Sequence, residues 1–251
     1  NCAPRSSWIL GGALVLASLI GAIGFYNAKQ PIDTLSVTGS AERVITADVA
    51  KWTTNVTRTA DSAGLKGASD QIKKDVADVQ NYFRQSGLKD EEITVTPVTV
   101  SPVCENQNNV MYDKFGNQTC GSGKPFGYSL QQTVVVESND AKKVTDLSQK
   151  APNALINRGL IFSSQNLEYY YSKLADLKIE LTGEATKDAQ KRAEEIAKAT
   201  GGHIGALQSA TLGVVQVTAK NSAEVSDYGA YDTSALEKKV TTVVKTSFIL
   251  K

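Results

Sequence analysis

The N-terminal region carries the longest apolar segment of the chain. Residues 8–26 (WILGGALVLASLIGAIGFY) contain no charged side chain. As a helix this segment would be about 28 Å long, close to the thickness of a bilayer core. Trp8 and Tyr26 stand at its two ends, where aromatic residues favour the membrane interface. The pattern predicts one transmembrane helix, and residues 1–30 are interpreted as an N-terminal membrane anchor.

A cleaved signal peptide is the alternative interpretation of this segment, because a basic residue followed by an apolar run is typical of both. The run is long for a signal peptide, which favours an uncleaved signal-anchor. Since the N-terminal flank is short, we expect the N-terminus in the cytoplasm and the body on the other side of the membrane. Ala13, Ala17 and Gly21 recur every four residues, a spacing that lets two helices approach closely.

Beyond residue 30 the pattern alternates between strands and helices. Stretches rich in Val, Thr and Ile with a period of two predict strands, and a turn between the first two is expected at Gly39. Pro97 and Pro102 remove hydrogen-bond donors, so their strand is expected at a sheet edge or a bulge. The strands are expected over residues 35–39, 42–59, 93–103, 128–137, 160–171, 204–218 and 239–251.

Three further segments have apolar residues at helical spacing. Gly87, Gly159 and Gly201 follow these segments as stop signals. Pro152 is expected to interrupt the second helix, because proline lacks the backbone donor that a helix interior uses. The helices are expected over residues 63–83, 141–157 and 173–200.

These elements predict an α+β fold for residues 31–251, taken as one domain. Each helix has a single apolar stripe to bury, so the helices are expected to pack on one face of antiparallel or mixed sheets. Two βαβ-like halves, around the helices of residues 63–83 and 173–200, are one arrangement of such a domain.

Charge and composition narrow the range of functions. The chain has 27 Lys and Arg against 26 Asp and Glu, a formal charge of +1. This balance argues against nucleic-acid binding, which needs a concentrated basic surface. The single histidine, His203, follows a helix stop and is interpreted as a capping residue, while Glu91-Glu92 and Glu194-Glu195 are interpreted as solvated surface. We therefore assign no catalytic, cofactor-binding or metal-binding residues.

Cys104 and Cys120 bracket a polar segment rich in Asn and Gly. In an oxidising compartment a disulfide between them would stabilise this loop by about 3 kcal/mol in the chain-entropy model. Two free thiols in a cytosolic loop are the alternative if the orientation of the anchor is reversed. A metal site made of these cysteines and His203 is disfavoured, since structural zinc takes four protein ligands.

Five tyrosines are candidate interface residues, because tyrosine combines a large contact area with a polar end. The alternative is that they complete a strand or stiffen a loop. They are Tyr169, Tyr170, Tyr171, Tyr228 and Tyr231.

The body resembles the SIMPL-domain family over about residues 35–250. In its C-terminal half LIFSSQNLEYYY, EATKDAQKRAEEIAKATGG and IGALQSATLG follow one another, with Ala185, Ala189, Ala193 and Ala197 repeating in the helix. The opening SVTGSAERVITADVAKWTTNVT is similar to the start of the same domain. Members are α+β proteins of largely unknown function, usually exported to the bacterial periplasm or envelope, and some form large ring or channel-like oligomers. The resemblance implies an envelope protein with an assembly role and brings no catalytic residues.

The leading hypothesis is a non-catalytic protein of the bacterial inner membrane, with a single membrane-spanning segment and its body in the periplasm. It would assemble with copies of itself into a ring, cage or channel-like homo-oligomer, and its partners would be itself and the lipid bilayer, without nucleic acid or a cofactor. The alternative is a membrane-tethered binding module that recruits a ligand or envelope partner through the loop between Cys104 and Cys120. An enzyme that works without histidine is a third alternative.

Overall fold

The computed structural model describes residues 12–22, 33–105, 110–116, 118–121, 124–224 and 226–251. The chain divides into two compact units. The smaller unit contains the described part of Asn1–Ala41 together with Thr182–Gly213 and Val243–Lys251. The larger unit contains Glu42–Leu181 and Val214–Thr242. The α+β class predicted from the sequence is confirmed, with antiparallel strand pairs in every sheet of the described residues.

The larger unit is built on a five-stranded antiparallel sheet. Its strands are β2 (Val49–Ala60), β3 (Ile93–Val95), β4 (Thr99–Val103), β7 (Gly127–Ser138) and β8 (Ile161–Tyr170). Their order is β3-β7-β2-β8, and β4 also pairs with β7. The proline-containing stretch therefore forms two short strands, β3 and β4, that each pair with β7 and leave their other side unpaired by the described strands.

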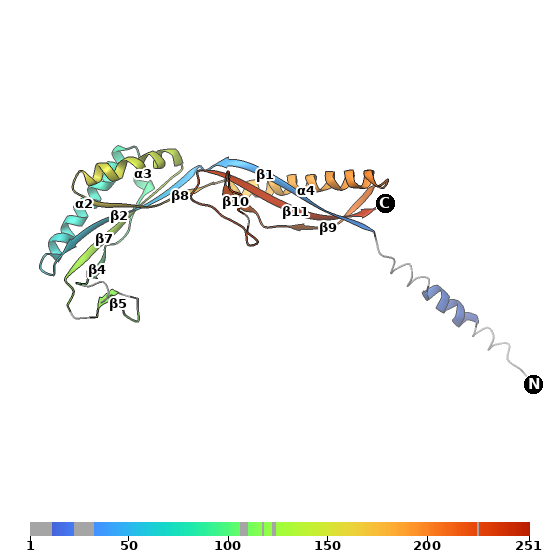
Figure 1. Cartoon of the computed structure of the whole chain (residues 1–251), viewed down its shortest axis with the longest axis horizontal. Helices are drawn as coiled ribbons and strands as arrows, with labels where there is room; N and C mark the ends of the chain where they lie inside the picture. The colour runs from blue at the N-terminus through green and yellow to red at the C-terminus, as the bar shows by residue number, and fades with distance from the viewer. Residues whose placement is uncertain (1–11, 23–32, 106–109, 117, 122–123, 225) are drawn as a thin grey trace, which may run out of the picture. The chain divides into compact units, whose positions relative to one another are not determined.

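Two helices cover one face of this sheet, α2 (Leu65–Gln85) and α3 (Ala141–Ile156), while β5 lies on the opposite side (Figure 1). A short 3-10 helix, η1 (Asp90–Glu92), leads into β3. Helix α2 joins β2 to β3 across β7, and α3 joins β7 to β8 across β2. Each helix thus links strands that run parallel without being neighbours, which is a split form of the βαβ unit.

The core of the larger unit lies between this sheet and its two helices. Trp52 is fully buried, its ring centroid lies 5.4 Å from that of Phe83, and its Nε1 donates to Ser164 Oγ at 2.9 Å. Alternate residues of β2 face the helices, because successive side chains of a strand point to opposite faces. The buried set includes Ala50, Val56, Ile72, Val79, Val134, Val136, Val144, Leu147 and Leu155.

An ion pair also joins the sheet to α2. Asp75 is buried on α2, and its carboxylate accepts from Arg58 Nε and, at 2.9 Å, from Arg58 Nη2. Gln71 Nε2 donates to the same carboxylate at 3.0 Å. The hydrogen bonds to Asp75 raise the pKa of Arg58. Because both oxygens of the carboxylate are bound, the buried charge of Asp75 is compensated.

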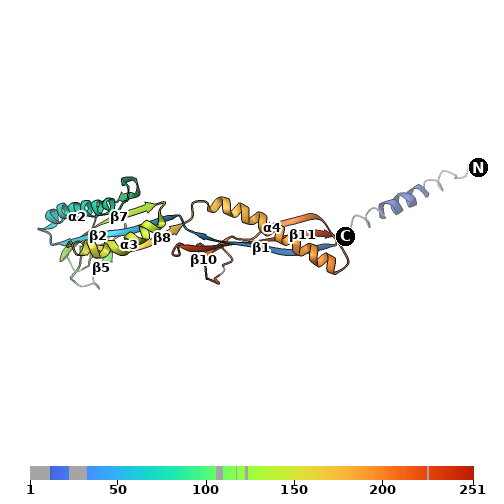
Figure 2. The same cartoon turned by 90° about the horizontal axis from the view of Figure 1, so that it is seen from above.

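The second sheet contains β1 (Thr34–Thr46), β9 (Ile204–Leu212), β10 (Gln216–Ala219) and β11 (Glu237–Leu250). Strand β11 is central, with β1 on one side and β10 and β9 on the other. Figure 2 shows α4 (Leu174–Ala199) beside β1 and β11. In the smaller unit Val37, Ala193 and Phe248 form a buried cluster between this helix and the sheet.

The predicted turn at Gly39 is wrong. Gly39 lies in the middle of β1, and the chain turns instead at Ala47 and Asp48, between β1 and β2. At Gly39 the strand crosses α4 so closely that a Cβ would lie 2.2 Å from the carbonyl oxygen of Ala185. The glycine is therefore required by close packing and not by a turn.

Two further boundaries differ from the prediction. The strand expected over residues 204–218 is divided into β9 and β10, because the pairing with β11 shifts by one residue between Leu212↔Val244 and Gln216↔Thr241. Pro152 lies inside α3 and does not interrupt it. The neighbouring Ala151 and Leu155 are fully buried and hold the last turn of the helix on the sheet.

The N-terminal anchor is described only in part. Residues 12–22 form a helix that carries Ala13, Ala17 and Gly21 on its exposed surface, whereas Trp8 and Tyr26 lie outside the described residues. Among the described residues, no helix combines the length and the apolar character that crossing a membrane requires.

Candidate functional site

A disulfide joins Cys104, which follows β4, to Cys120 in β6. The predicted pairing is confirmed, with Cα atoms 5.6 Å apart. Between the cysteines β5 (Val110–Tyr112) pairs with β6 (Gln118–Cys120), and we call this pair the disulfide hairpin. A two-stranded hairpin is only marginally stable alone, so the disulfide is the main constraint on it. Gln118 Nε2 also donates to the carbonyl oxygen of Pro102 at 3.2 Å and fixes the hairpin to β4.

Large apolar side chains are exposed on and beside the disulfide hairpin. The exposed fractions are 59% for Met111, 70% for Tyr112, 77% for Phe115 and 76% for Phe126. Lys114 Nζ lies 5.0 Å from the centre of the Phe115 ring. Single exposed apolar residues are common, but several together in one short constrained segment are typical of a recognition surface.

A groove of about 550 Å³ separates the disulfide hairpin from the sheet. One wall consists of Thr99 and Ser101 on β4 with Ser129 and Gln131 on β7. Thr99 pairs with Gln131 and Ser101 with Ser129, so the four side chains share one face of the sheet. Tyr112 of the hairpin contributes to the other wall, and none of the described residues that line the groove is charged. The groove offers hydroxyl and amide groups, one aromatic ring and the apolar side chains of Pro102, Val103 and Val110.

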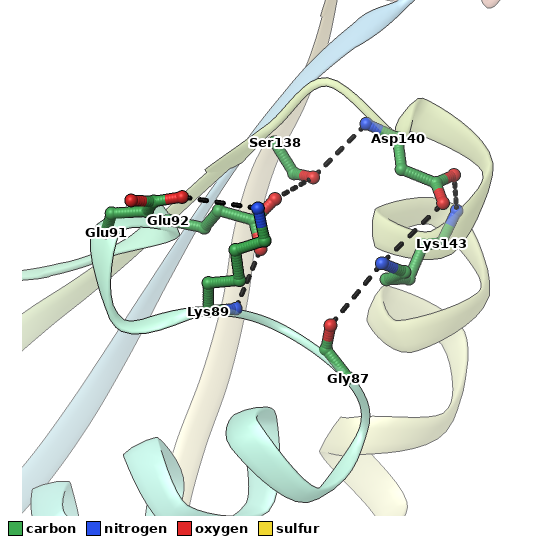
Figure 3. A network of polar contacts seen from close by, with 7 residues as sticks. All are labelled: Gly87, Lys89, Glu91, Glu92, Ser138, Asp140 and Lys143. Carbon is green, nitrogen blue, oxygen red and sulfur yellow. Dashed lines mark hydrogen bonds and ion pairs between the residues drawn. The ribbon is translucent and has the colours of Figure 1, made fainter.

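A second hollow, of about 570 Å³, is lined by charged residues near the start of α3. Figure 3 shows its polar contacts. Ser138 Oγ donates to a carboxylate oxygen of Glu92 and accepts from the backbone N–H of Asp140 at 3.2 Å. Asp140 caps α3 by accepting from Lys143 N, and Lys143 Nζ donates to the carbonyl oxygen of Gly87 at 3.4 Å. The contacts join the start of β3 to the turn between β7 and α3.

The carboxylate of Glu92 is held in its charged form by this network. Burial acts to raise its pKa, but hydrogen bonds from Lys89 N and Ser138 Oγ and the charges of Lys143 and Lys89 outweigh burial, and the pKa is lowered. The resulting stabilisation is present above the unfolded pKa of the group and is lost as the pH falls through the folded pKa. Since the polar groups in Figure 3 bind one another, we interpret the network as structural.

The adjacent carboxylates Glu91 and Glu92 do not act on a common point. Glu91 pairs with Lys89 Nζ at 3.4 Å, whereas Glu92 is directed to Ser138 (Figure 3). Glu194 accepts from Gln190, and Glu195 pairs with Lys198, both within α4. Neither pair has the shared geometry that acid–base catalysis requires.

A buried lysine lies beneath the loop that precedes β11. Lys238 is 1% exposed, and its Nζ donates to the carbonyl oxygen of Asp232 at 2.6 Å and pairs with Asp232 Oδ1 at 3.5 Å. Burial lowers the pKa of Lys238, against the effect of the Asp232 charge. The backbone hydrogen bond from Ala235 and the charge of Lys238 lower the pKa of Asp232 despite its burial. The contacts between Lys238 and Asp232 fix the loop before β11 on the sheet. A hollow of about 320 Å³ lies beside Asp232.

The five candidate interface tyrosines differ in burial and in contacts. Tyr169 is buried in the core with its hydroxyl 2.8 Å from Thr145 Oγ1, so it completes a strand and is not an exposed anchor. The rings of Tyr170 and Tyr231 lie 6.5 Å apart. Tyr171 is half-buried, and Tyr228 is 97% exposed. Tyr228 and Tyr231 are the most exposed members of the set.

His203 is exposed, and its backbone N–H and C=O bond to Lys251 across the sheet. A metal site made of His203 and the two cysteines is disfavoured, because Cys104 and Cys120 are joined in the disulfide. Among the described residues no cluster of three or more His, Cys, Asp or Glu side chains has a geometry that could hold a metal ion.

The sequence interpretation missed the groove residues Gln131, Ser129, Thr99, Ser101 and Tyr112. One signal was present, since the alternation in YSLQQTVVVE places Ser129 and Gln131 on the face opposite the buried Leu130 and Val134. The position of the hairpin relative to this face depends on contacts between residues that are distant in sequence. The alternation of apolar and polar residues along one strand does not predict such contacts.

The family of the chain follows from its match to a family model. Residues 35–248, which cover both units, match the SIMPL model, described as a protein of unknown function (DUF541). No curated protein matches the chain. The fold and the match agree with the resemblance found in the sequence, and the chain belongs to the SIMPL family.

Proposed function

We propose that this SIMPL protein is a non-catalytic structural protein of the bacterial envelope that assembles with copies of itself. The observation that carries this proposal is the exposed edge of β9 in the smaller unit. Within the described residues β9 pairs only with β11, and its side chains from position 206 to 212 are exposed. An unpaired strand edge is a template on which another chain adds a strand.

The β9 edge lacks the features that protect edge strands. Its sequence IGALQSATL has no charged residue and no proline, and Leu207 and Leu212 are 49% and 53% exposed. The outer side of β1 differs, because Asp188 of α4 accepts a hydrogen bond from the backbone N–H of Ser40 at 2.9 Å. Strand β9 is therefore the better candidate for pairing between subunits.

The register identifies which groups of β9 are available to a second chain. Gly213 donates its N–H to the carbonyl oxygen of Val243, next to the pair Leu212↔Val244. Hydrogen-bonded and non-hydrogen-bonded pairs alternate along an antiparallel ladder. Thr211 and Ser209 therefore bond to β11, whereas Ala210 and Leu212 direct their N–H and C=O groups outward.

Replacing Ala210 with proline is expected to abolish or strongly weaken self-assembly. Proline removes the outward N–H and its ring obstructs strand addition, while the bonds of Ser209 and Thr211 to β11 remain. The measurement is the mass of the 251-residue chain in mild detergent at micromolar concentration by sedimentation velocity.

The matched control is Ala210→Thr, which keeps the backbone donor and suits a strand. We expect this variant to assemble like the unmodified chain. Equal masses for the proline and threonine variants would contradict the role of the β9 edge, provided that circular dichroism shows both to be folded.

The proposed location is the inner membrane, with the N-terminus in the cytoplasm and the body in the periplasm. Residues 8–26 would form the anchor, and the small residues Ala13, Ala17 and Gly21 would let anchors pack against each other. The disulfide between Cys104 and Cys120 supports an oxidising compartment such as the periplasm. Tyr228 and Tyr231 remain candidate contacts between subunits.

A second candidate function is a tethered binding module that uses the disulfide hairpin. The exposure of Met111, Tyr112 and Phe115 favours it, because these apolar side chains lie in the segment that the disulfide closes, and the exposed Phe126 follows that segment. Self-assembly through β9 leaves the hairpin available, so the two functions are compatible.

Photocrosslinking tests the binding module in cells. A photoreactive amino acid at Phe115 is expected to give a discrete adduct with a partner, and the same residue at the exposed position Lys66 of α2 serves as the control. Mass spectrometry of the adduct identifies the partner. Adducts of equal yield at both positions, or none at Phe115, would contradict this function.

A further inference from the structure

The face of the five-stranded sheet turned away from α2 and α3 carries a continuous field of uncharged polar side chains. Trp52, Thr54 and Val56 point toward the helices and are buried, so the residues between them point to the other face. The register across the strands places polar residues side by side in three rows. The rows are Ser101, Ser129 and Thr59; Thr99, Gln131 and Thr57, which ends at the exposed Ile161 on β8; and Thr133, Asn55 and Ser163.

Charged residues appear on this face only beyond the three rows. Toward the start of β2 the first charged row contains Lys51, which lies opposite Glu137 on β7 and Glu168 on β8 in the strand register. The row between holds Thr53 and Val135. A ligand lying over Thr57 and Gln131 would therefore meet hydroxyl and amide groups.

The disulfide hairpin turns one end of this field into the groove of about 550 Å³. This volume lies within the range of small-ligand sites, and a concave surface removes more of a ligand from water than a flat one. Tyr112 and Gln118 line the groove from the hairpin side. The hairpin is held by the disulfide and by the bond from Gln118 to Pro102, so the groove is preformed.

The polar side chains of the groove wall are available for binding. Within the described residues, no hydrogen bond involves the side chains of Thr99, Ser101, Ser129 or Gln131. In the free protein these groups bind water. A ligand that supplies both donors and acceptors can replace that water without leaving polar groups unpaired.

We propose that this groove binds a neutral oligosaccharide. A sugar chain offers closely spaced hydroxyl groups that both donate and accept, which match serine and threonine hydroxyls and the amide of Gln131. The apolar face of the Tyr112 ring suits the C–H side of a sugar ring, and the Tyr112 hydroxyl can hydrogen-bond to a hydroxyl at the edge of the sugar. The inference rests on the second proposed function, because it gives the ligand class of the disulfide hairpin.

Other ligand classes fit the groove less well. An anionic ligand such as a phosphate or a carboxylate is recognised by arginine or lysine, and the groove lining carries no charge among the residues that the structure describes. A fatty acyl chain would leave the polar wall without hydrogen bonds. Hydroxyl density and neutrality together favour the sugar.

Calorimetric titration of the 251-residue chain in mild detergent tests the inference. The probes are cellohexaose, maltohexaose and chitohexaose, which are neutral chains of different linkage and substituent. We expect saturable binding of at least one of them at micromolar to millimolar concentration. Absence of binding by all three at millimolar concentration would overturn the inference.

Two groove variants and one control locate the binding site. Gln131→Met keeps the length of the side chain and removes its hydrogen bonds, and Tyr112→Ala removes the ring. Each is expected to weaken binding about tenfold, as for a polar ligand group left without its partner. Thr53→Val, on the same face but outside the groove, is expected to bind like the unmodified chain. Binding unchanged in both groove variants would also overturn the inference.

Failure of the sugar inference can be distinguished from failure of the binding-module function. If no oligosaccharide binds while a photoreactive residue at Phe115 still gives a partner adduct, the hairpin binds another class of ligand and the sugar inference alone fails. If neither experiment gives a signal, both the inference and the function on which it rests are rejected.

Discussion

Replacing Gly39 with alanine is expected to lower the free energy of unfolding by about 3 kcal/mol. The new Cβ would lie 2.2 Å from the carbonyl oxygen of Ala185 and 2.3 Å from the backbone nitrogen of Ala189. Both atoms belong to the backbone of α4 and cannot turn aside as a flexible side chain can. Strand β1 and helix α4 must therefore separate, and the buried contacts of Val37 and Ala193 weaken.

Urea unfolding followed by circular dichroism measures this effect, and Gly67→Ala provides the matched control. Gly67 lies in α2, and an added Cβ there meets no atom within 4 Å. Alanine is the better helix former, so the control is expected to gain up to about 1 kcal/mol. A Gly39→Ala protein as stable as the unmodified chain would show that β1 does not approach α4 in this way.

Replacing Arg58 with methionine is expected to cost about 3 kcal/mol. Asp75 is 2% exposed, and the change removes the guanidinium that binds both of its oxygens. Gln71 alone then remains as a hydrogen-bond partner of the carboxylate among the contacts described. A buried charge without an ionic partner is strongly destabilising, whereas methionine still fills part of the space of the arginine stem.

The double variant Arg58→Met/Asp75→Leu separates the cost of an unpaired charge from the value of the ion pair. Removing both charges is expected to restore most of the lost stability, because no group is left buried without a partner. Chemical unfolding of the single and double variants gives the comparison. A double variant less stable than Arg58→Met would mean that the pair itself, and not the orphaned carboxylate, dominates the effect.

The elements that the sequence predicted correctly are those whose pattern is local. The helix expected over residues 63–83 is α2, Leu65–Gln85, because its apolar stripe repeats at the helical period and Gly87 adopts a positive φ of 91° after it. The strand expected over residues 128–137 is β7, Gly127–Ser138. The disulfide was predictable because only two cysteines bracket the polar loop of the body.

The features that sequence patterns did not predict depend on contacts between distant segments. A glycine between two strand-like stretches suits a turn, but Gly39 is required by the backbone of α4, about 150 positions along the chain. The division between β9 and β10 arises from a one-residue shift in their pairing with β11. Tyr169 is one of three consecutive tyrosines in the sequence, and its burial follows from its place in the core, where its hydroxyl contacts Thr145.

The candidate site likewise has features that local sequence patterns predict and features that depend on contacts between distant segments. Alternation along β7 indicates that Ser129 and Gln131 share a face, but the rows that they form with β4 and β2 follow from the register of three separate strands. The groove exists because the disulfide hairpin lies against this face, and hydrophobic periodicity carries no information on that position. The sequence indicates the loop between Cys104 and Cys120 as a candidate binding segment, whereas the proposed ligand class follows from the sheet wall opposite the hairpin.

Self-assembly is tested most directly by the mass and symmetry of the unmodified 251-residue chain in mild detergent at micromolar concentration. Native mass spectrometry with single-particle imaging provides both quantities. We expect one homo-oligomeric mass and closed, symmetric particles in which β9 lies between subunits. A single monomeric mass with dispersed small particles would contradict self-assembly.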